Sequence, residues 1–134
     1  MTPVPVTLAA AAASVIVNIW LGSRIVALRK TFKVSVGDGG HEPLLRRMRA
    51  QANFIENAPF VLILVGGLEL SGASRWTLLA IAVLFVLARI AHAVGMDGGE
   101  GPRWRMYGMM GSTLATAALT IWALACAGGE FLSR

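Results

Sequence analysis

The polar residues best suited to chemistry in this 134-residue chain stand inside two otherwise apolar segments. Arg49, Asn53 and Glu56 follow one another at spacings of four and three residues, which places them on one face of a helix. Arg89 and His92, three residues apart, share a helical face in the second segment. Arginine binds carboxylates in a planar, two-point geometry. These residues therefore favour a site for a small polyanionic metabolite over a site for an apolar one.

A structural interpretation of the same residues is also open. They would form a polar seam that joins helices, in which Glu56 neutralises one arginine. We favour the ligand interpretation because the arginines outnumber the single nearby carboxylate. A surplus of positive charge in a half-buried place is stable when water or a bound anion supplies the counter-charge.

Other chemistries lack the residues that they need. His41 and His92 are the only histidines and have no metal-ligand spacing, and Cys126 is the only cysteine, so we expect no metal site. The glycines of residues 37–40 are not followed by the lysine and hydroxyl residue of a phosphate-binding loop. The net charge of +5 does not indicate nucleic-acid binding, because the basic residues end apolar stretches and are not interleaved with aromatic residues.

The elements that must position these residues are membrane-spanning helices. Charged residues make up 14% of the chain, against about a quarter in soluble proteins. Residues 1–23 and 106–129 carry no charge, and each is long enough to cross a bilayer as a helix. Two further helices span only if they continue through charged residues, which must then face a protein interior or a wet cavity. We expect one all-α domain over residues 1–134, an integral membrane, left-handed four-helix bundle with helices at about 5–30, 43–71, 74–96 and 103–128.

The basic residues predict the orientation of this bundle. Ten of the twelve Lys and Arg residues flank the first and third connections, and only Arg75 and Arg134 lie toward the other side. Basic residues accumulate in cytoplasmic loops. We therefore expect the first and third connections in the cytoplasm and both termini on the opposite side. The compact chain suits a bacterial inner membrane.

At these residues the sequence resembles the MAPEG family, the membrane-associated proteins in eicosanoid and glutathione metabolism. Residues 49–60 closely resemble the signature of that family, residues 29–35 resemble the basic end of its first helix, and residues 88–92 resemble part of its third helix. The resemblance implies a homotrimer of four-helix protomers, with glutathione bound between adjacent protomers near the cytoplasmic side. Small residues such as Ala9 and Ala13, or Gly111 and Ala115, would allow the close helix approach of such an assembly.

The resemblance also implies the roles of individual residues. Arg49 and Asn53 would hold the peptide and its carboxylate, and Glu56 would bind the γ-glutamyl ammonium group. Further contacts to glutathione are expected from Arg29, Gln51, Arg89 and His92. The thiolate-stabilising arginine of the family falls at the start of the fourth helix, where we prefer Arg103 to Arg105. Tyrosines around the glutathione of family members are replaced here by Asn57, His92 and Met96.

The function that the resemblance implies is that of a membrane-bound, glutathione-dependent transferase or peroxidase, with glutathione as co-substrate. The glutathione thiolate would attack a lipophilic electrophile or hydroperoxide that arrives from the membrane lipid. Two alternatives stay open, a non-catalytic lipid-binding or scaffold protein of the same family and a small multidrug-type transporter. The excess of arginine over carboxylate in the membrane-embedded site argues against the transporter.

Overall fold

Proline and loop residues mark where the helices begin and end. The computed structural model describes residues 3–98 and 101–132, which form α1 (Pro5–Phe32), α2 (Glu42–Leu70), α3 (Arg75–Gly95) and α4 (Gly101–Leu132). A proline in the first turn begins both α1 and α2, where its fixed φ suits the helix and its missing N–H is not needed. α1 ends where Lys33 adopts a left-handed conformation, with φ of 55°. The all-helical class and the four helices expected from the sequence are confirmed.

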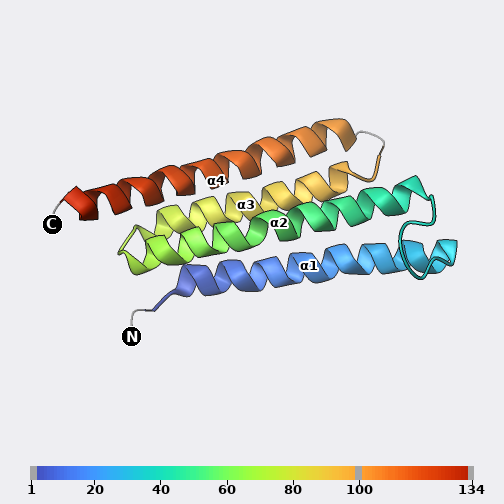
Figure 1. The fold of residues 1–134 in the computed structure, drawn as a ribbon, viewed down its shortest axis with the longest axis horizontal. Helices are drawn as coiled ribbons and strands as arrows, with labels where there is room; N and C mark the ends of the chain where they lie inside the picture. Colours follow the sequence, from blue (N-terminus) through green and yellow to red (C-terminus); the bar gives the residue numbers. More distant parts are fainter. Residues whose placement is uncertain (1–2, 99–100, 133–134) are drawn as a thin grey trace.

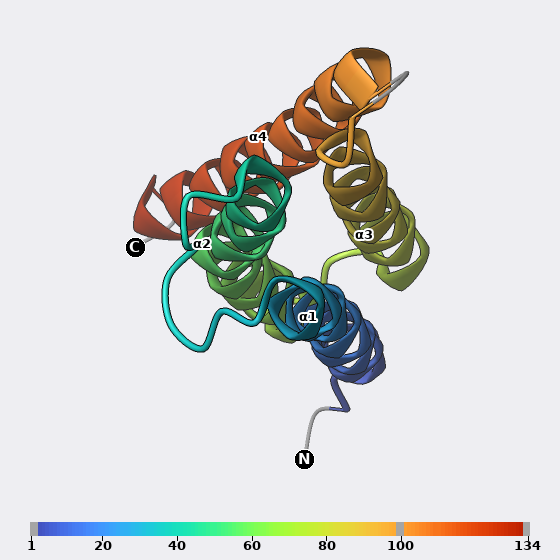
Figure 2. The same ribbon diagram turned by 90° about the vertical axis from the view of Figure 1, so that its right-hand side faces the viewer.

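The helices run alternately in opposite directions. The α1–α2 and α3–α4 connections therefore lie at one end of the molecule, here called the connection end, and both chain termini lie at the other (Figure 1). In the end-on view, α2 lies between α1 and α4, and α3 borders the other three helices (Figure 2). Within the described residues α1 and α4 make no contact, and α4 packs most extensively against α3.

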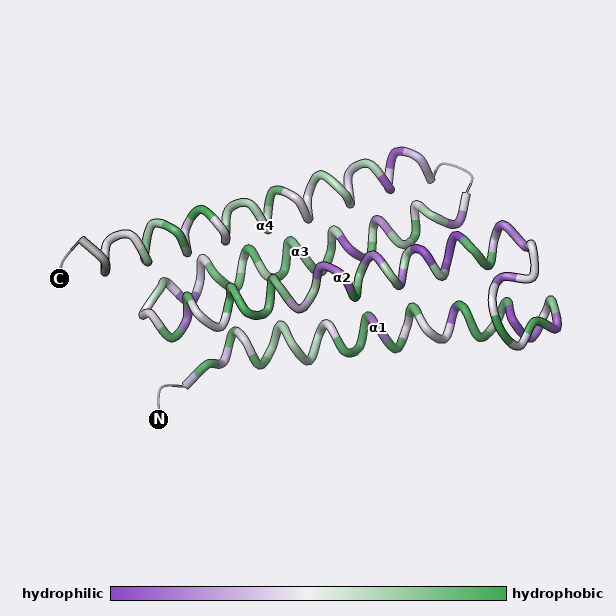
Figure 3. The backbone as a smooth tube through the Cα atoms, viewed as in Figure 1, coloured by the Kyte–Doolittle hydropathy of each residue, from purple (hydrophilic) through white to green (hydrophobic). Residues whose placement is uncertain are grey.

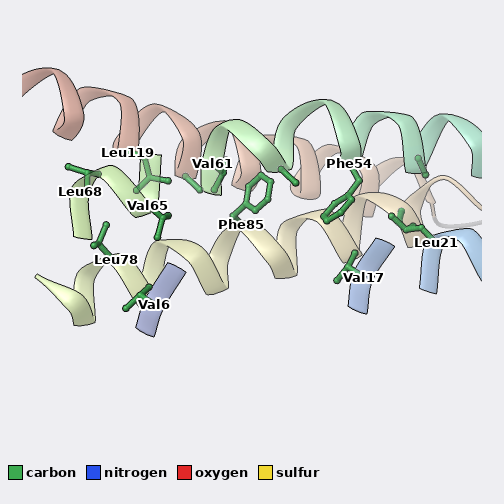
Figure 4. Packing of buried hydrophobic residues seen from close by; sticks show 14 residues of the cluster. Val6, Val17, Leu21, Phe54, Val61, Val65, Leu68, Leu78, Phe85 and Leu119 are labelled. Carbon is green, nitrogen blue, oxygen red and sulfur yellow. The ribbon is translucent and has the colours of Figure 1, made fainter. Parts of the chain in front are cut away.

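Apolar side chains from all four helices meet along the bundle. The core includes Val17 and Leu21 from α1, Phe54, Val61 and Val65 from α2, Leu78 and Phe85 from α3, and Leu119 from α4 (Figure 4). In a bilayer, lipid tails are as apolar as these side chains, so helices associate through close packing and interhelical hydrogen bonds.

The outward faces of the bundle suit a lipid environment. Each of the four described helices is long and apolar enough to cross a membrane. Large apolar side chains such as Ile19, Ile63 and Leu114 point away from the core and are about two-thirds exposed. Hydrophilic residues gather instead on α2 and α3 toward the connection end (Figure 3). This is the part of the bundle where a polar site can form.

An ion-pair cluster ties the connection end together. Asp97, which follows α3, forms ion pairs with Arg24 of α1 and Arg47 of α2. The Arg47 Nε lies 3.0 Å from an Asp97 oxygen, and Arg47 also donates a hydrogen bond of 2.9 Å to the Arg24 carbonyl oxygen. One carboxylate thus joins the segment before α4 to both α1 and α2.

At the opposite end, the N-terminus of α1 is capped by a side chain from α2. The buried Glu69 carboxylate accepts hydrogen bonds from the backbone N–H groups of Val6 at 3.0 Å and Thr7 at 2.8 Å, and from the Thr7 hydroxyl at 2.7 Å. The first N–H groups of a helix have no partner within it, and a negative charge there is favourable. Glu69 therefore caps the N-terminus of α1, a role that usually belongs to the residue just before the helix.

Gly108 marks the closest approach of α3 and α4. A Cβ atom at this position would lie 2.3 Å from the His92 nitrogen and 2.5 Å from the Ala88 carbonyl oxygen. One turn later, a Cβ at Gly111 would lie 3.1 Å from the Ala88 Cβ. The two backbones can come together only because these positions lack side chains, and their contact fixes the first turns of α4 against α3.

Candidate functional site

A polar cleft opens between α2, α3 and the start of α4, toward the connection end. It has a volume of about 570 Å³, which lies within the range of roughly 300–1,000 Å³ typical of small-molecule sites. Its lining consists of Arg49, Ala52, Asn53, Glu56, His92, Met96, Pro102, Arg105, Met106 and Met109. The cleft thus brings together four of the residues expected to bind glutathione, namely Arg49, Asn53, Glu56 and His92.

Arg49 and Glu56 carry opposite charges along one wall of the cleft. They are seven residues apart on α2, which separates them by about 10 Å along the helix axis. Both are exposed in the protomer. Among the residues whose positions are described, neither forms an ion pair. The polar-seam interpretation required an ion pair between Glu56 and an arginine, and the described residues contain no such direct pair.

His92 and Arg105 form the opposite side of the cleft. Nδ1 of the buried His92 lies 3.4 Å from the carbonyl oxygen of Arg105, so the tautomer protonated at Nδ1 donates this hydrogen bond. The contact lies one turn before Gly108, where α3 and α4 are closest. The glycine contact therefore holds the Arg105 backbone next to His92.

The two arginines at the start of α4 differ in position. Arg105 lines the polar cleft, whereas Arg103 lines none of the cavities described in this section. Two residues along a helix correspond to a rotation of about 200°, so the two side chains leave α4 on different sides. Within one protomer, the structure places Arg105 at the cleft.

Arg89 lies in a second cavity beside the polar cleft, here called the Arg89 cavity, with a volume of about 460 Å³. Arg89 as a residue is 5% exposed, and its guanidinium group donates a hydrogen bond to the side-chain oxygen of Asn53, which lines both cavities from α2. The remaining lining is Asn57, Met109, Ser112, Thr113, Thr116, Ala117, Thr120 and Ile121. Arg89 is thus linked to the polar cleft by its hydrogen bond to Asn53.

Arg29 and Gln51 line a third space, a groove between α1 and α2 of about 440 Å³ that we call the α1 groove. Arg29 donates a hydrogen bond of 2.7 Å to the Ser35 carbonyl oxygen, and Gln51 donates one of 3.2 Å to the Asn18 side chain. The groove and the polar cleft lie on different faces of α2 and share only Ala52. Within one protomer, the glutathione ligands expected in the cleft and those in the groove therefore form separate groups, and Arg89 lies in a cavity of its own.

The sequence interpretation missed a row of hydroxyl residues on α4. Ser112, Thr116 and Thr120 follow one another at intervals of four and line the Arg89 cavity. Each hydroxyl donates a hydrogen bond of 2.8 Å to the carbonyl oxygen four residues earlier. Their regular spacing within an uncharged span was the available signal, because it predicts one polar stripe on a membrane helix.

Comparisons with known proteins agree with a membrane location. The model of the MAPEG family matches residues 7–125. Two similar proteins are both described as inner membrane protein YecN, from Escherichia coli strains K12 and O6:H1 (CFT073). Each is 28% identical over 97 residues, which cover 72% of this chain and 73% of the relative. Together with four helices able to span a bilayer, these matches indicate a multi-pass inner membrane protein.

Proposed function

Because the chain belongs to the MAPEG family, we propose that it is a membrane-bound, glutathione-dependent transferase or peroxidase acting on a lipophilic electrophile. Glutathione is the co-substrate and binds in the polar cleft. The electrophile enters from the surrounding lipid, because the outward faces of the helices around the cleft are apolar.

The observation that carries this proposal is the placement of Arg49 and Glu56 on one wall of the cleft. Their separation of about 10 Å along α2 is close to the length of an extended tripeptide, which is also about 10 Å. Glutathione offers a carboxylate at one end and the γ-glutamyl ammonium and carboxylate at the other. Arg49 then binds a carboxylate in a two-point geometry, Glu56 binds the ammonium, and Asn53 lies between them.

Arg105 is our candidate for stabilising the glutathione thiolate. The thiolate is the nucleophile, and a positive charge within about 4–6 Å favours it over the thiol. Arg105 takes this role in our proposal, ahead of Arg103, because only Arg105 lines the cleft. The thiolate sulfur then forms a bond to the electrophilic carbon, and the leaving group departs with the electron pair of its bond.

A homotrimer would combine the two groups of expected ligands. Arg29 and Gln51 line the α1 groove on a different face of α2 from Arg49 and Glu56. When one face of a protomer binds a different face of the next protomer, the contact is heterologous. If successive protomers are related by a rotation of 120°, three such contacts close into a ring. The polar cleft of one protomer would then face the α1 groove of the next, with glutathione between them.

Glutathione-dependent thermal stabilisation of the purified protein in detergent tests the binding proposal. Glu56→Gln should weaken the stabilisation, because an amide cannot neutralise the ammonium group, while native mass spectrometry should still show a trimer. Glu42→Gln is the matched control, since Glu42 lies on the same helix and pairs with Arg46 outside the cleft. Equal glutathione affinity in Glu56→Gln and the parent would refute the assigned role, and monomers or dimers in mild detergent would refute the trimer.

Turnover of an aryl halide or a hydroperoxide tests the reaction. Arg105→Ala should reduce turnover far more than glutathione affinity and should reduce the ultraviolet absorbance of bound thiolate near neutral pH. Arg103→Ala is the parallel variant, and a larger loss there would transfer the role to Arg103. If glutathione binds but neither substitution changes thiolate formation or turnover, the non-catalytic binding protein becomes the better description.

A further inference from the structure

Arg89 is a buried cation with too few partners. It lies six residues before the end of α3 at Gly95, so its backbone is about 9 Å along the helix from that end. Its side chain donates to the neutral amide oxygen of Asn53, and its Nε atom is buried with no hydrogen-bond partner in the described part of the chain. Among the residues that the structure describes, the lining of its cavity includes no acidic side chain.

Such an arrangement is costly unless a ligand completes it. A guanidinium group has five N–H donors and stays charged at physiological pH. Charged side chains inside a membrane usually pair with an opposite charge or line a water-filled cavity. Beside Arg89, the hydroxyl residues Ser112, Thr116 and Thr120 of α4 continue the polar lining of the cavity away from the connection end. Such a polar row is unusual for a helix that contacts only lipid.

The cavity also contains groups that can bind an anion together with Arg89. The hydroxyl groups of Ser112 and Thr116 donate to the backbone of their own helix, and a hydroxyl hydrogen can rotate toward a ligand instead. The Asn57 side chain lines the same space from α2; its amide donates one hydrogen bond of 2.7 Å to the Asn53 carbonyl oxygen, which leaves one N–H for a ligand. The donors thus surround the cavity from α2, α3 and α4.

We propose that the Arg89 cavity is a second binding site, separate from the polar cleft, for a carboxylate group held by Arg89 and the hydroxyl groups of α4. The carboxylate belongs either to a free small ion or to the head of an amphipathic molecule from the lipid. This site does not depend on the proposed glutathione function, because only Asn53 and Met109 are common to the two linings.

Two rival sources of the negative charge predict different results. A carboxylate of glutathione could extend from the polar cleft to Arg89, in which case Arg89 and Arg49 would serve the same ligand. Glu56 could supply the counter-charge through water, since it lines the neighbouring cleft. Comparison of Arg89→Gln with Arg49→Gln tests the first rival, and Glu56→Gln tests the second.

The experiment measures thermal stability of the full-length protein in an uncharged detergent during titration with formate and, separately, with decanoate. We expect at least one of the two to stabilise the parent protein in a saturable manner. In Arg89→Gln, the apparent affinity should fall by about tenfold to a hundredfold, as expected when a hydrogen-bonded charge is lost. Arg49→Gln is the control and should bind the same carboxylate as the parent does.

One further variant keeps the test decisive. Thr116→Leu fills part of the cavity without touching the charge, and it should weaken carboxylate binding even if Arg89→Gln does not fold. Glutathione stabilisation should survive in Arg89→Gln and in Thr116→Leu. Stabilisation by both formate and decanoate identifies a free-ion site, and stabilisation by decanoate alone identifies the head of an amphipathic molecule.

Three results would overturn the proposal. The first is the absence of saturable stabilisation by either carboxylate. The second is loss of glutathione stabilisation in Arg89→Gln to the same degree as in Arg49→Gln, which assigns Arg89 to the glutathione site. The third is carboxylate binding that occurs only in Glu56→Gln, which shows that Glu56 already neutralises Arg89.

Discussion

Substitution of Gly108 by alanine should separate α3 from α4. The new Cβ would lie 2.3 Å from the His92 nitrogen, and ordinary contact begins at 3.4 Å, so the helices must move apart by about 1.1 Å. The opposing atoms belong to the backbone and cannot rotate away. Overpacking of this kind costs about 1–3 kcal/mol, and the helix propensity gained by replacing glycine offsets at most about 1 kcal/mol. After this offset, we expect Gly108→Ala to lower the free energy of unfolding by up to about 3 kcal/mol, and by about 1–3 kcal/mol relative to a glycine-to-alanine change that meets no neighbour.

The same displacement should alter the polar cleft. Arg105, one turn before Gly108, would lose the contact of its carbonyl oxygen with His92, which is already 3.4 Å long. Turnover should therefore fall in Gly108→Ala even at temperatures where the protein is fully folded. Unfolding by sodium dodecyl sulfate in mixed micelles, followed by circular dichroism, measures the stability, and the aryl halide assay measures turnover.

Two other glycines serve as graded controls. At Gly67 a Cβ would meet nothing within 4 Å, so Gly67→Ala should leave stability unchanged or raise it by up to about 1 kcal/mol. Gly111→Ala should lie between the two, because its Cβ would be 3.1 Å from the side chain of Ala88. If Gly108→Ala proves as stable and as active as Gly67→Ala, α3 and α4 do not approach each other as closely at Gly108 as described here, and the reasoning is refuted.

Further outcomes are expected at both ends of the bundle. Glu69→Gln should destabilise the protein by about 1–3 kcal/mol, because the charge that caps α1 is lost; the micelle unfolding assay measures it. Asp97→Asn should release two arginines at the connection end and make the backbone amides before α4 exchange hydrogen faster. In a Cys126→Ser background, a cysteine in residues 36–40 should be protected from an impermeant thiol reagent in intact cells, whereas a cysteine in residues 71–74 should be labelled.

Matched substitutions control these predictions. Glu42→Gln removes an exposed glutamate whose one ion pair among the described residues is with Arg46 of its own helix, so it should change stability by less than about 1 kcal/mol. Asp38→Asn alters the other connection-end aspartate, whose side chain has no ion pair among the described residues, and should leave exchange before α4 unchanged. Labelling of both cysteines, or of the first alone, would contradict the predicted orientation.

The helices and the shared face of Arg49, Asn53 and Glu56 could be predicted from the sequence because both are local properties. Uncharged runs of sufficient length give the spans, and spacing along one helix gives the face. Spacing does not say which neighbouring helix that face will meet. The family resemblance places Gln51 and Arg89 with the glutathione ligands, and within one protomer Gln51 lines the α1 groove and Arg89 lies in its own cavity.

Contacts that depend on where two helices cross could not be predicted from the sequence either. Gly108 and Gly111 look alike in the chain, and only Gly111 was singled out as a close-packing residue, yet the tightest contact is at Gly108. The choice between Arg103 and Arg105 depends on a rotation of about 200° at the start of α4. That rotation is set by the contact with α3.

The capping of α1 by Glu69 has a consequence for the order in which the protein is made. Thr7 and Glu69 are separated by 62 positions, so at about 5–20 residues per second the ribosome adds Glu69 roughly 3–12 s after Thr7. During this interval the first turn of α1 has no carboxylate partner. The α1–α2 hairpin is therefore the smallest nascent piece that contains a complete first helix, and a chain released before Glu69 would carry an α1 with an unprotected N-terminus at the membrane surface.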